Sequence, residues 1–217
     1  MSSVQQLIQN AEPHWRAYIE HDFVLRLADG TLDKRCFQHY LKQDYRYLFH
    51  YNRALALALF KAENFAQMEQ AHHAIQTILQ ESKLHVTFCQ RWGIAEPELL
   101  QTPESAACVA YTRYVLDCGI NGSLVDLYAA IAPCALGYAE IARHIVERQL
   151  SPPDNPYQDW IDTYASDDFQ LAAAELTDFL DQLCQELTEK QRTKVQTIFN
   201  TATRMEVAFW QMGLDLS

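Results

Sequence analysis

The chain has 217 residues, a formal net charge of −11 and no stripe of Lys and Arg, which argues against a nucleic-acid partner because phosphate contacts require clustered basic residues. It contains no apolar run of 18 residues and no basic-then-apolar N-terminus, so we expect no membrane partner, no signal peptide and a cytoplasmic location. Six cysteines without a C-x-x-C pair predict reduced thiols, and the absence of linkers and repeats predicts one domain over residues 1–217.

Helical periodicity covers nearly the whole chain, and no segment alternates as a strand would. We expect helices over about 4–28, 33–62, 64–92, 103–118, 123–150, 156–164, 169–187 and 189–212. The first should bend near Pro13. Thr102 is the expected N-cap of the fourth helix, with Pro103 at its first position, and Ser123 with Asp126 resembles a capping box. A helical content above one half predicts an all-α bundle.

Pro133 and Cys134 lie in the middle of the helix predicted over 123–150. A proline inside a helix removes a backbone hydrogen bond and costs about 3 kcal/mol. Spacings of three and four define the inward stripe of this helix, which contains Leu124, Leu127, Ile131, Cys134, Tyr138, Ile141 and Ile145. Cys134 is therefore expected to face inward beside a kink, although a small buried hydrophobe is the simpler interpretation of a cysteine taken alone.

Two other predicted helices each carry one carboxylate on an otherwise apolar face. Asp44 interrupts a stripe formed by Phe37, Leu41, Leu48, Tyr51 and Leu55. Glu206 interrupts a stripe formed by Val195, Phe199, Ala202, Phe209 and Gly213. A carboxylate on such a face is costly unless it is paired, and it is a frequent sign of a functional site. A buried ion pair or an exposed rim position explains either residue alone, but both together with Cys134 favour a site.

Aromatic residues lie within one turn of each of these polar side chains: Tyr47, Tyr138 and Phe209. Such a pocket suits a flat, partly apolar small molecule. A thiolate attacks electrophilic carbon, and a neighbouring carboxylate moves protons to and from a substrate. No glycine-rich phosphate loop is present, which argues against nucleotide-dependent chemistry. We expect Trp210, the next aromatic along, to be ordinary core.

A metal site is not expected. Glu69 and His72 form one E-x-x-H pair, whereas a di-iron bundle needs two such pairs and two further glutamates. The chain offers no second pair at this spacing. We interpret His72, His73 and His85 as surface or structural residues.

Six short segments, taken in order, match the pattern of a known family: DGTL (29–32), LKQDYRYL (41–48), AYTRY (110–114), APCALGY (132–138), WIDTYAS (160–166) and MEVAFWQM (205–212). On these segments the chain resembles the TenA/thiaminase II family over essentially its full length. The match departs from familiar members in CALGY, where small residues replace bulky aromatics. This departure predicts an enlarged pocket.

The resemblance implies a heme-oxygenase-like all-α fold without haem, assembled as a cytoplasmic homotetramer. It implies hydrolysis at the aminopyrimidine of thiamin or its breakdown products, as part of thiamin salvage. The product is 4-amino-5-hydroxymethyl-2-methylpyrimidine, released from aminomethylpyrimidine by deamination or from thiamin itself. No metal or organic cofactor is implied.

The resemblance also implies roles for individual residues. Cys134, which places the chain in the cysteine-containing branch, resembles the nucleophile that adds to C6 of the pyrimidine. Asp44 resembles the carboxylate that binds the exocyclic amine and a ring nitrogen, and Glu206 resembles the acid/base that serves the leaving group and the ring. The implied pocket tyrosines and ring-stacking walls are Tyr111, Tyr138, Tyr164, Tyr47 and Phe209. Of these, Tyr111 and Tyr164 rest on the resemblance alone.

Two alternatives use the same features differently. A heme-oxygenase-like di-iron oxidase would share the helical fold. A non-catalytic protein that binds thiamin or its pyrimidine would keep the pocket without the reaction.

Overall fold

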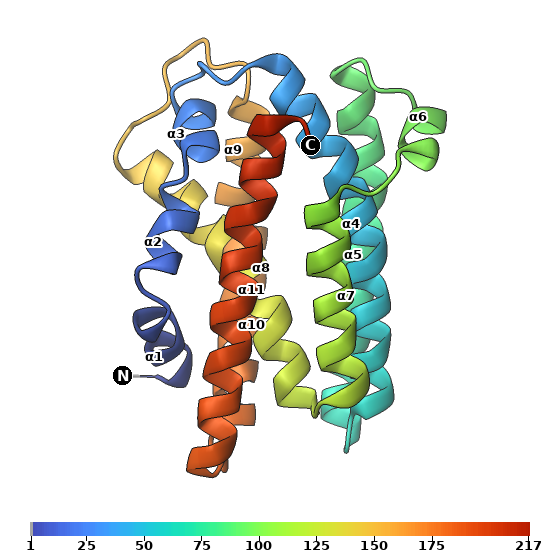
Figure 1. Cartoon of the computed structure of the whole chain (residues 1–217), viewed down its shortest axis with the longest axis vertical. Helices are drawn as coiled ribbons and strands as arrows, with labels where there is room; N and C mark the ends of the chain where they lie inside the picture. Colours follow the sequence, from blue (N-terminus) through green and yellow to red (C-terminus); the bar gives the residue numbers. More distant parts are fainter. Residues whose placement is uncertain (1) are drawn as a thin grey trace.

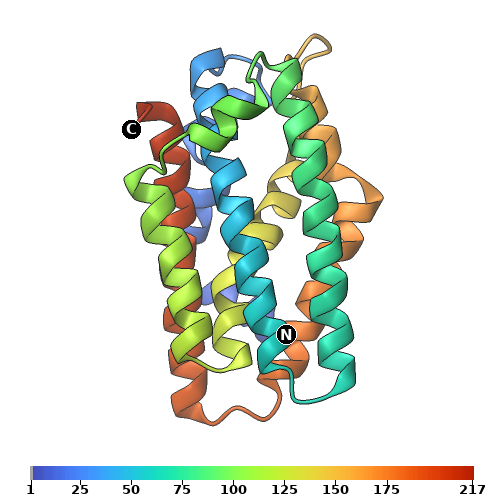
Figure 2. The same ribbon diagram turned by 90° about the vertical axis from the view of Figure 1, so that its right-hand side faces the viewer.

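The computed structural model describes residues 2–217, is helical over 81% of the chain and has no strand in the described part. Its helices are α1 (Ser3–Asn10), α2 (His14–Ile19), α3 (Asp22–Ala28), α4 (Lys34–Lys61), α5 (Phe65–Arg91), α6 (Glu96–Gln101), α7 (Ala106–Asn121), α8 (Leu124–Glu147), α9 (Gln158–Ala165), α10 (Asp167–Cys184) and α11 (Glu189–Asp215). The long helices α4, α5, α7 and α11 run along the long axis of the molecule (Figures 1 and 2). The all-α bundle expected from the sequence is confirmed.

The segment predicted as one bent N-terminal helix is instead three short helices, α1, α2 and α3. The first break falls at Pro13, as expected, and Pro13 becomes the N-cap of α2. The second break was not predicted. It falls at His21, which has an extended backbone and a ring nitrogen that accepts a hydrogen bond from the N–H of Phe23. All three helices pack against α11 at one side of the bundle (Figure 1).

The predicted start of the fourth helix is also wrong. Thr102 ends the short helix α6, which the periodicity did not reveal, and Pro103 lies in the connection that follows. The N-cap of α7 is Ser105, whose hydroxyl accepts a hydrogen bond from the N–H of Cys108. Ser105 satisfies a free N–H group of the first turn, which the predicted N-cap, Thr102, cannot do because it caps the end of α6.

Helix α8 lies at the centre of the bundle. The Asp126 carboxylate accepts hydrogen bonds from the N–H and hydroxyl of Ser123, as predicted for its start. The helix continues unbroken through Pro133 but ends at Glu147, three residues before the predicted end. Gln149 takes the left-handed conformation there, with φ 53°, and the N–H of Leu150 bonds back to the carbonyl oxygen of Ile145. This Schellman-type cap, and not the prolines beyond it, stops the helix.

By length and composition alone α8 is apolar enough to cross a membrane. Of its most apolar 18-residue window, however, 83% is buried inside the protein, where it packs against α7, α9, α10 and α11. The helix is therefore the core helix of the bundle, and its hydrophobicity is accounted for by that position.

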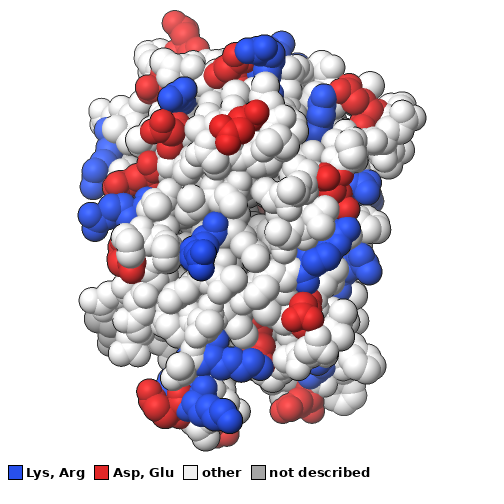
Figure 3. Space-filling model, viewed as in Figure 1, with Lys and Arg blue, Asp and Glu red and all other residues white. Residues whose placement is uncertain are grey.

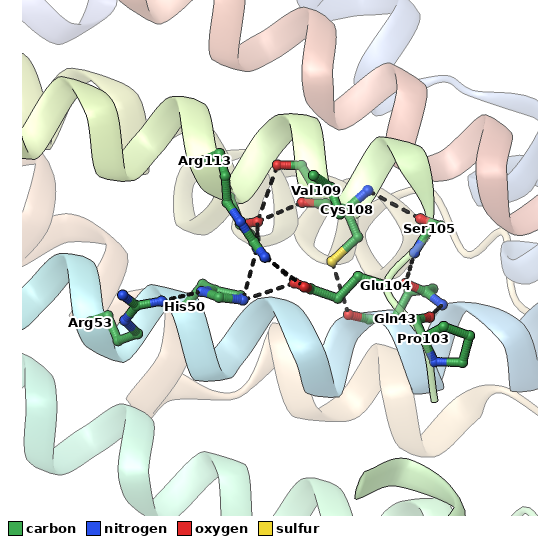
Figure 4. A network of polar contacts seen from close by, with 10 residues as sticks. Gln43, His50, Arg53, Pro103, Glu104, Ser105, Cys108, Val109 and Arg113 are labelled. Carbon is green, nitrogen blue, oxygen red and sulfur yellow. Dashed lines mark hydrogen bonds and ion pairs between the residues drawn. The ribbon is translucent and has the colours of Figure 1, made fainter. Parts of the chain in front are cut away.

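A polar network fixes α4 to the beginning of α7 (Figure 4). The buried amide of Gln43 donates to the carbonyl of Pro103 at 3.0 Å and accepts from the N–H of Ser105 at 2.9 Å. Glu104 accepts two hydrogen bonds from the Arg113 guanidinium, at 2.7 and 2.6 Å, and contacts His50 at 2.8 Å. Gln43 precedes Asp44 in the chain, so the network holds α7 in register beside that carboxylate.

The surface carries both signs of charge. On the face shown in Figure 3, basic and acidic side chains are interspersed around a largely uncharged centre. No continuous basic stripe is visible on this face, which agrees with the interpretation of the composition.

Candidate functional site

Five of the eight predicted site residues line one cavity of about 50 Å³: Asp44, Tyr47, Cys134, Tyr138 and Tyr164. They come from α4, α8 and α9. The rest of its wall is formed by Leu48, Tyr51, Ile78, Glu81, Ala135 and Phe169. Segments more than one hundred residues apart in the chain therefore meet at one small, largely aromatic cavity.

The other three predicted residues lie behind the Tyr47 wall. The Tyr47 ring packs against that of Tyr111, with centroids 5.0 Å apart, and against that of Phe209, with centroids 5.8 Å apart. The hydroxyl of Tyr111 donates a hydrogen bond of 2.6 Å to Oε1 of Glu206. Phe209 is therefore a supporting wall for Tyr47, and it does not line the cavity itself.

Cys134 is half-buried and faces the cavity, as its stripe predicted. Burial raises the pKa of the Cys134 thiol well above its usual range, and the charge of Glu206 raises it further. The hydroxyl of Tyr47 offsets part of this rise in pKa and makes no conventional hydrogen bond in the described structure. The resting sulfur is therefore a neutral thiol that needs a proton acceptor before it can attack.

Glu206 is buried in α11 and is 2% exposed. Burial raises the pKa of Glu206 to about 8, and the hydrogen bond from Tyr111 opposes that rise. Tyr18 also opposes it, although its hydroxyl makes no hydrogen bond of ordinary length. Glu206 is thus a carboxylic acid over most of the neutral range, able to give up a proton and take it back.

Asp44 faces His85 of α5, with Oδ2 3.5 Å from Nδ1. The other ring nitrogen of His85 lies 2.9 Å from the carbonyl oxygen of Leu41, to which it must donate its proton. Burial raises the pKa of Asp44 to about 7 and lowers the pKa of His85. Both shifts favour a neutral ring beside a carboxyl group whose protonated form is stabilised by burial. His85 is therefore structural, as expected, but it is not a surface residue.

Tyr138 and Tyr164 pack edge to face, with ring centroids 4.8 Å apart. The hydroxyl of Tyr138 donates to that of Tyr40 at 3.3 Å, and the indole N–H of Trp160 donates to the same oxygen at 3.1 Å. Tyr40 is fully buried and fixes the ring of Tyr138 against the cavity. Trp210 is fully buried core, as expected, and it stacks on Tyr138 at 5.2 Å.

Sequence reasoning missed Glu81, Tyr18 and Tyr40. Glu81 projects from α5 into the cavity, and the chain contained a signal for it, because Glu81 and His85 are one helical turn apart. Tyr18 is placed by Gly137 of α8: a Cβ at that glycine would lie 2.0 Å from the Tyr18 ring. Nothing in the sequence separates Tyr18 or Tyr40 from ordinary core tyrosines.

No group of three or more His, Cys, Asp or Glu side chains is arranged to hold a metal ion within residues 2–217. Glu69 and His72, the one E-x-x-H pair, are both exposed on α5. The di-iron alternative therefore has no ligand cluster in the described part of the chain to support it.

Comparison with known proteins identifies the family. The model of the TENA/THI-4/PQQC family matches residues 8–216, and the chain belongs to that family. It is 61% identical to an uncharacterized protein of Haemophilus influenzae, covering 99% of this chain and 100% of the relative. It is 38% identical to the aminopyrimidine aminohydrolase of Halalkalibacterium halodurans, covering 99% of this chain and 96% of that enzyme.

Solved structures agree on the fold. A TenA family transcription regulator from Silicibacter sp. TM1040 superimposes with a TM-score of 0.92 at 41% identity, covering 98% of this chain and 96% of that one. A domain with a heme oxygenase-like fold from Shewanella denitrificans superimposes with a TM-score of 0.70 at 14% identity, covering 98% and 92% of the two chains. The expected heme-oxygenase-like fold is therefore confirmed.

Proposed function

We propose that this protein is an aminopyrimidine aminohydrolase of the thiaminase II type, acting in thiamin salvage. It hydrolyses aminomethylpyrimidine, thiamin or both to hydroxymethylpyrimidine, with ammonia or the thiazole as the second product. The observation that carries the proposal is that the thiol of Cys134, the carboxyl group of Asp44 and several tyrosines line a single cavity, with Glu206, a second carboxyl group of raised pKa, buried behind its Tyr47 wall. The relatives named aminopyrimidine aminohydrolase, at 30% to 38% identity, support it.

Asp44 is the proposed recognition group for the aminopyrimidine. The exocyclic amine of this ring is a donor, and the neighbouring ring nitrogen is an acceptor. A protonated carboxyl offers one acceptor and one donor, so it pairs with both, whereas a carboxylate only accepts. The burial that raises the pKa of Asp44 to about 7 favours the protonated form. At 3.5 Å the contact with His85 is too long to hold that proton, which stays available to the substrate.

Cys134 and Glu206 are the proposed covalent machinery. The acid form of Glu206 protonates the ring nitrogen next to C6 while the sulfur of Cys134 adds to C6. The thiol proton passes to Glu206, which regenerates its acid form. The ring loses its aromaticity, and its electrons can then expel the substituent on the 5-methylene carbon. Covalent addition thus divides a difficult displacement into two easier steps.

The second half of the reaction restores the enzyme. Glu206 protonates an amine leaving group as the carbon–nitrogen bond breaks, leaving an exocyclic methylene on the ring. Water adds to that methylene and forms the hydroxymethyl group. The carbon–sulfur bond then breaks, the ring becomes aromatic again and the sulfur recovers a proton. The net reaction consumes one water and needs no oxidant or reductant.

The proposal is tested by comparing hydrolysis rates of aminomethylpyrimidine, its N-formyl derivative and thiamin, with hydroxymethylpyrimidine measured by chromatography. Turnover on at least one substrate is expected. Tight binding of the pyrimidine by calorimetry without product at high enzyme concentration would replace the enzyme by a binding protein. Two iron atoms per chain in protein purified without chelator would favour the di-iron alternative.

We also propose a cytoplasmic homotetramer, a property that the family resemblance implies. Large exposed side chains such as Phe60 and Phe65, which are 85% and 83% exposed, are of the kind that subunit contacts bury. Sedimentation of the purified protein should give four times the 25.0 kDa chain mass. A monomeric mass at micromolar concentration would reject the assembly without affecting the proposed reaction.

A further inference from the structure

A second, larger chamber adjoins the catalytic cavity. It has a volume of about 320 Å³ and lies between α4, α5, α8 and α10. The two spaces share five wall residues: Tyr51, Ile78, Glu81, Ala135 and Phe169. Its rim includes the exposed side chains of Asp168 and Glu175, so the chamber opens to solvent. The outer chamber is therefore the neighbouring space that offers room for a bulky substituent of a ring held at Asp44 and Cys134.

The outer chamber is lined by three carboxyl groups and by neither Lys nor Arg. Besides two tyrosines, its ionisable wall residues are Glu81, Asp168, Glu175 and His73. Glu81 makes no hydrogen bond or ion pair among the described residues, although it lies at the wall shared by both spaces. Burial and the charge of Asp44 raise the pKa of Glu81 to about 7. A cation placed here would favour its ionised form, which the protein alone does not stabilise.

Two further side chains suit a bulky ligand. Ala135 follows Cys134 in α8 and lines both spaces, where its small side chain fills less room than a larger residue would. Tyr128 also lines the chamber, is 2% exposed, and its buried hydroxyl has no partner in the described structure. A hydroxyl-bearing ligand would supply that partner.

We propose that the outer chamber is the subsite for the leaving group, that it accepts bulky cationic heterocycles such as a hydroxyethyl thiazolium, and that Glu81 is the residue that selects for positive charge. The inference rests on the proposed function. An anionic phosphate ester on the same substituent is disfavoured, because it would enter a chamber that offers the carboxyl groups of Glu81, Asp168 and Glu175 and no Lys or Arg. Thiamin is thus preferred over its monophosphate.

The first test compares kcat/KM for thiamin and thiamin monophosphate in the wild type and in Glu81→Gln. In the wild type, kcat/KM for thiamin should exceed kcat/KM for thiamin monophosphate by at least about tenfold, which is the effect expected from losing one favourable charge pair. Glu81→Gln should raise KM for thiamin and reduce that preference by about tenfold, with a smaller effect on kcat. Glu69→Gln, an exposed position of the same helix outside both spaces, is the matched control and should leave the preference unchanged.

The second test places a larger side chain at the wall that the two spaces share. Ala135→Leu should lower the ratio of kcat/KM for thiamin to that for aminomethylpyrimidine by about tenfold, because only thiamin carries a group large enough to need the chamber. Thermal melting of both variants separates a local effect from loss of the fold. Equal substrate ratios in wild type, Glu81→Gln and Ala135→Leu would overturn the inference.

Failure of the proposed function gives a different result. In that case no substrate yields hydroxymethylpyrimidine. The chamber is then tested by calorimetry, which measures the affinities of the wild type and of Glu81→Gln for thiamin and for thiamin monophosphate. Tighter binding of thiamin that is weakened by Glu81→Gln supports the chamber independently of turnover. Equal affinities for the two ligands would reject it.

Discussion

Glu206 makes the ionised form of Cys134 less stable, and Asp44 does the same for Glu206. The charge of Glu206 raises the pKa of the thiol, and burial raises the pKa of both groups. Both side chains therefore hold their protons when the cavity is empty near neutral pH. Under the proposed mechanism the nucleophile becomes reactive only when a pyrimidine is present to take a proton from Glu206, which protects the thiol from other electrophiles.

Tyr111→Phe should move the alkaline limb of the pH–activity profile to higher pH. The acid form of Glu206 is present below its pKa of about 8 and is lost above it. The hydrogen bond from Tyr111 lowers that pKa, so its removal raises it. The measurement is kcat between pH 6 and 10. Tyr114→Phe, on the same helix but outside the cavity, is the control, and a shift of the limb to lower pH would contradict the assignment.

Glu206→Gln should stabilise the fold at alkaline pH. The folded pKa of Glu206, about 8, lies above the unfolded value near 4.5. Between these values the folded state binds one more proton, so the free energy of unfolding falls by roughly 1 kcal/mol per pH unit as pH rises. Glu206→Gln has no titrating group at this position, so its free energy of unfolding does not fall in this way. Its stability gain over wild type, measured by urea unfolding, should be larger at pH 8 than at pH 5; an equal gain at both would count against the shifted pKa.

The sequence revealed the polar centre of the site better than its surroundings. Asp44 and Glu206 stand out because each interrupts an apolar stripe, and Cys134 stands out because it follows a proline inside a helix. Asp44 and Cys134 line one cavity, and Glu206 is near enough to raise the pKa of the thiol. Tyr18 and Tyr40 do not stand out, since a tyrosine on a core-facing stripe looks the same whether or not its hydroxyl faces a cavity. Their roles depend on distant partners that only the folded chain brings together.

Helix α8 is shaped for the site by one glycine. Gly137 lies one turn beyond Pro133, and it leaves room for the ring of Tyr18 from α2. Contact between the two helices is close enough that a single added methyl group would overlap the ring. The small residue therefore serves to bring a hydroxyl towards Glu206.

Gly137→Ala should lower the stability of the protein by about 1–2 kcal/mol. Alanine favours a helix by about 1 kcal/mol over glycine, but overpacking of a core costs about 1–3 kcal/mol, and here the new Cβ would lie 2.0 Å from Tyr18. Chemical denaturation gives the value. The control Gly119→Ala meets only the ends of two leucine side chains, at 3.0 and 3.1 Å, and should cost less. A stabilised Gly137→Ala protein would show that Tyr18 is not held by this contact.

The predicted helices differ from the observed ones at a short helix and at a helix end. Periodicity located α4, α5 and α11 to within three residues because each carries a long apolar face. It did not reveal α6, which has six residues, or the end of α8, which depends on the left-handed backbone of Gln149. Glutamine has no special preference for that conformation, so no residue type marks this end.

The assembled bundle joins residues that the chain keeps far apart. Asp44, Cys134 and Glu206 come from α4, α8 and α11, and helices α9 and α7 add Tyr164 and Tyr111. No local pattern encodes this convergence, so Tyr111 and Tyr164 could be named only through resemblance to a family. The outer chamber is likewise a product of the packing of four helices, and its charge becomes visible only in the folded chain.

The proposed covalent mechanism requires the thiol of Cys134 to act as the nucleophile. The decisive measurement is the turnover of Cys134→Ala on aminomethylpyrimidine and on thiamin, beside Cys184→Ala, which removes a buried thiol outside both spaces. We predict that Cys134→Ala loses at least about a hundredfold in kcat on every substrate that the wild type hydrolyses, whereas Cys184→Ala keeps wild-type turnover. Near wild-type turnover by Cys134→Ala on both substrates would contradict the covalent mechanism.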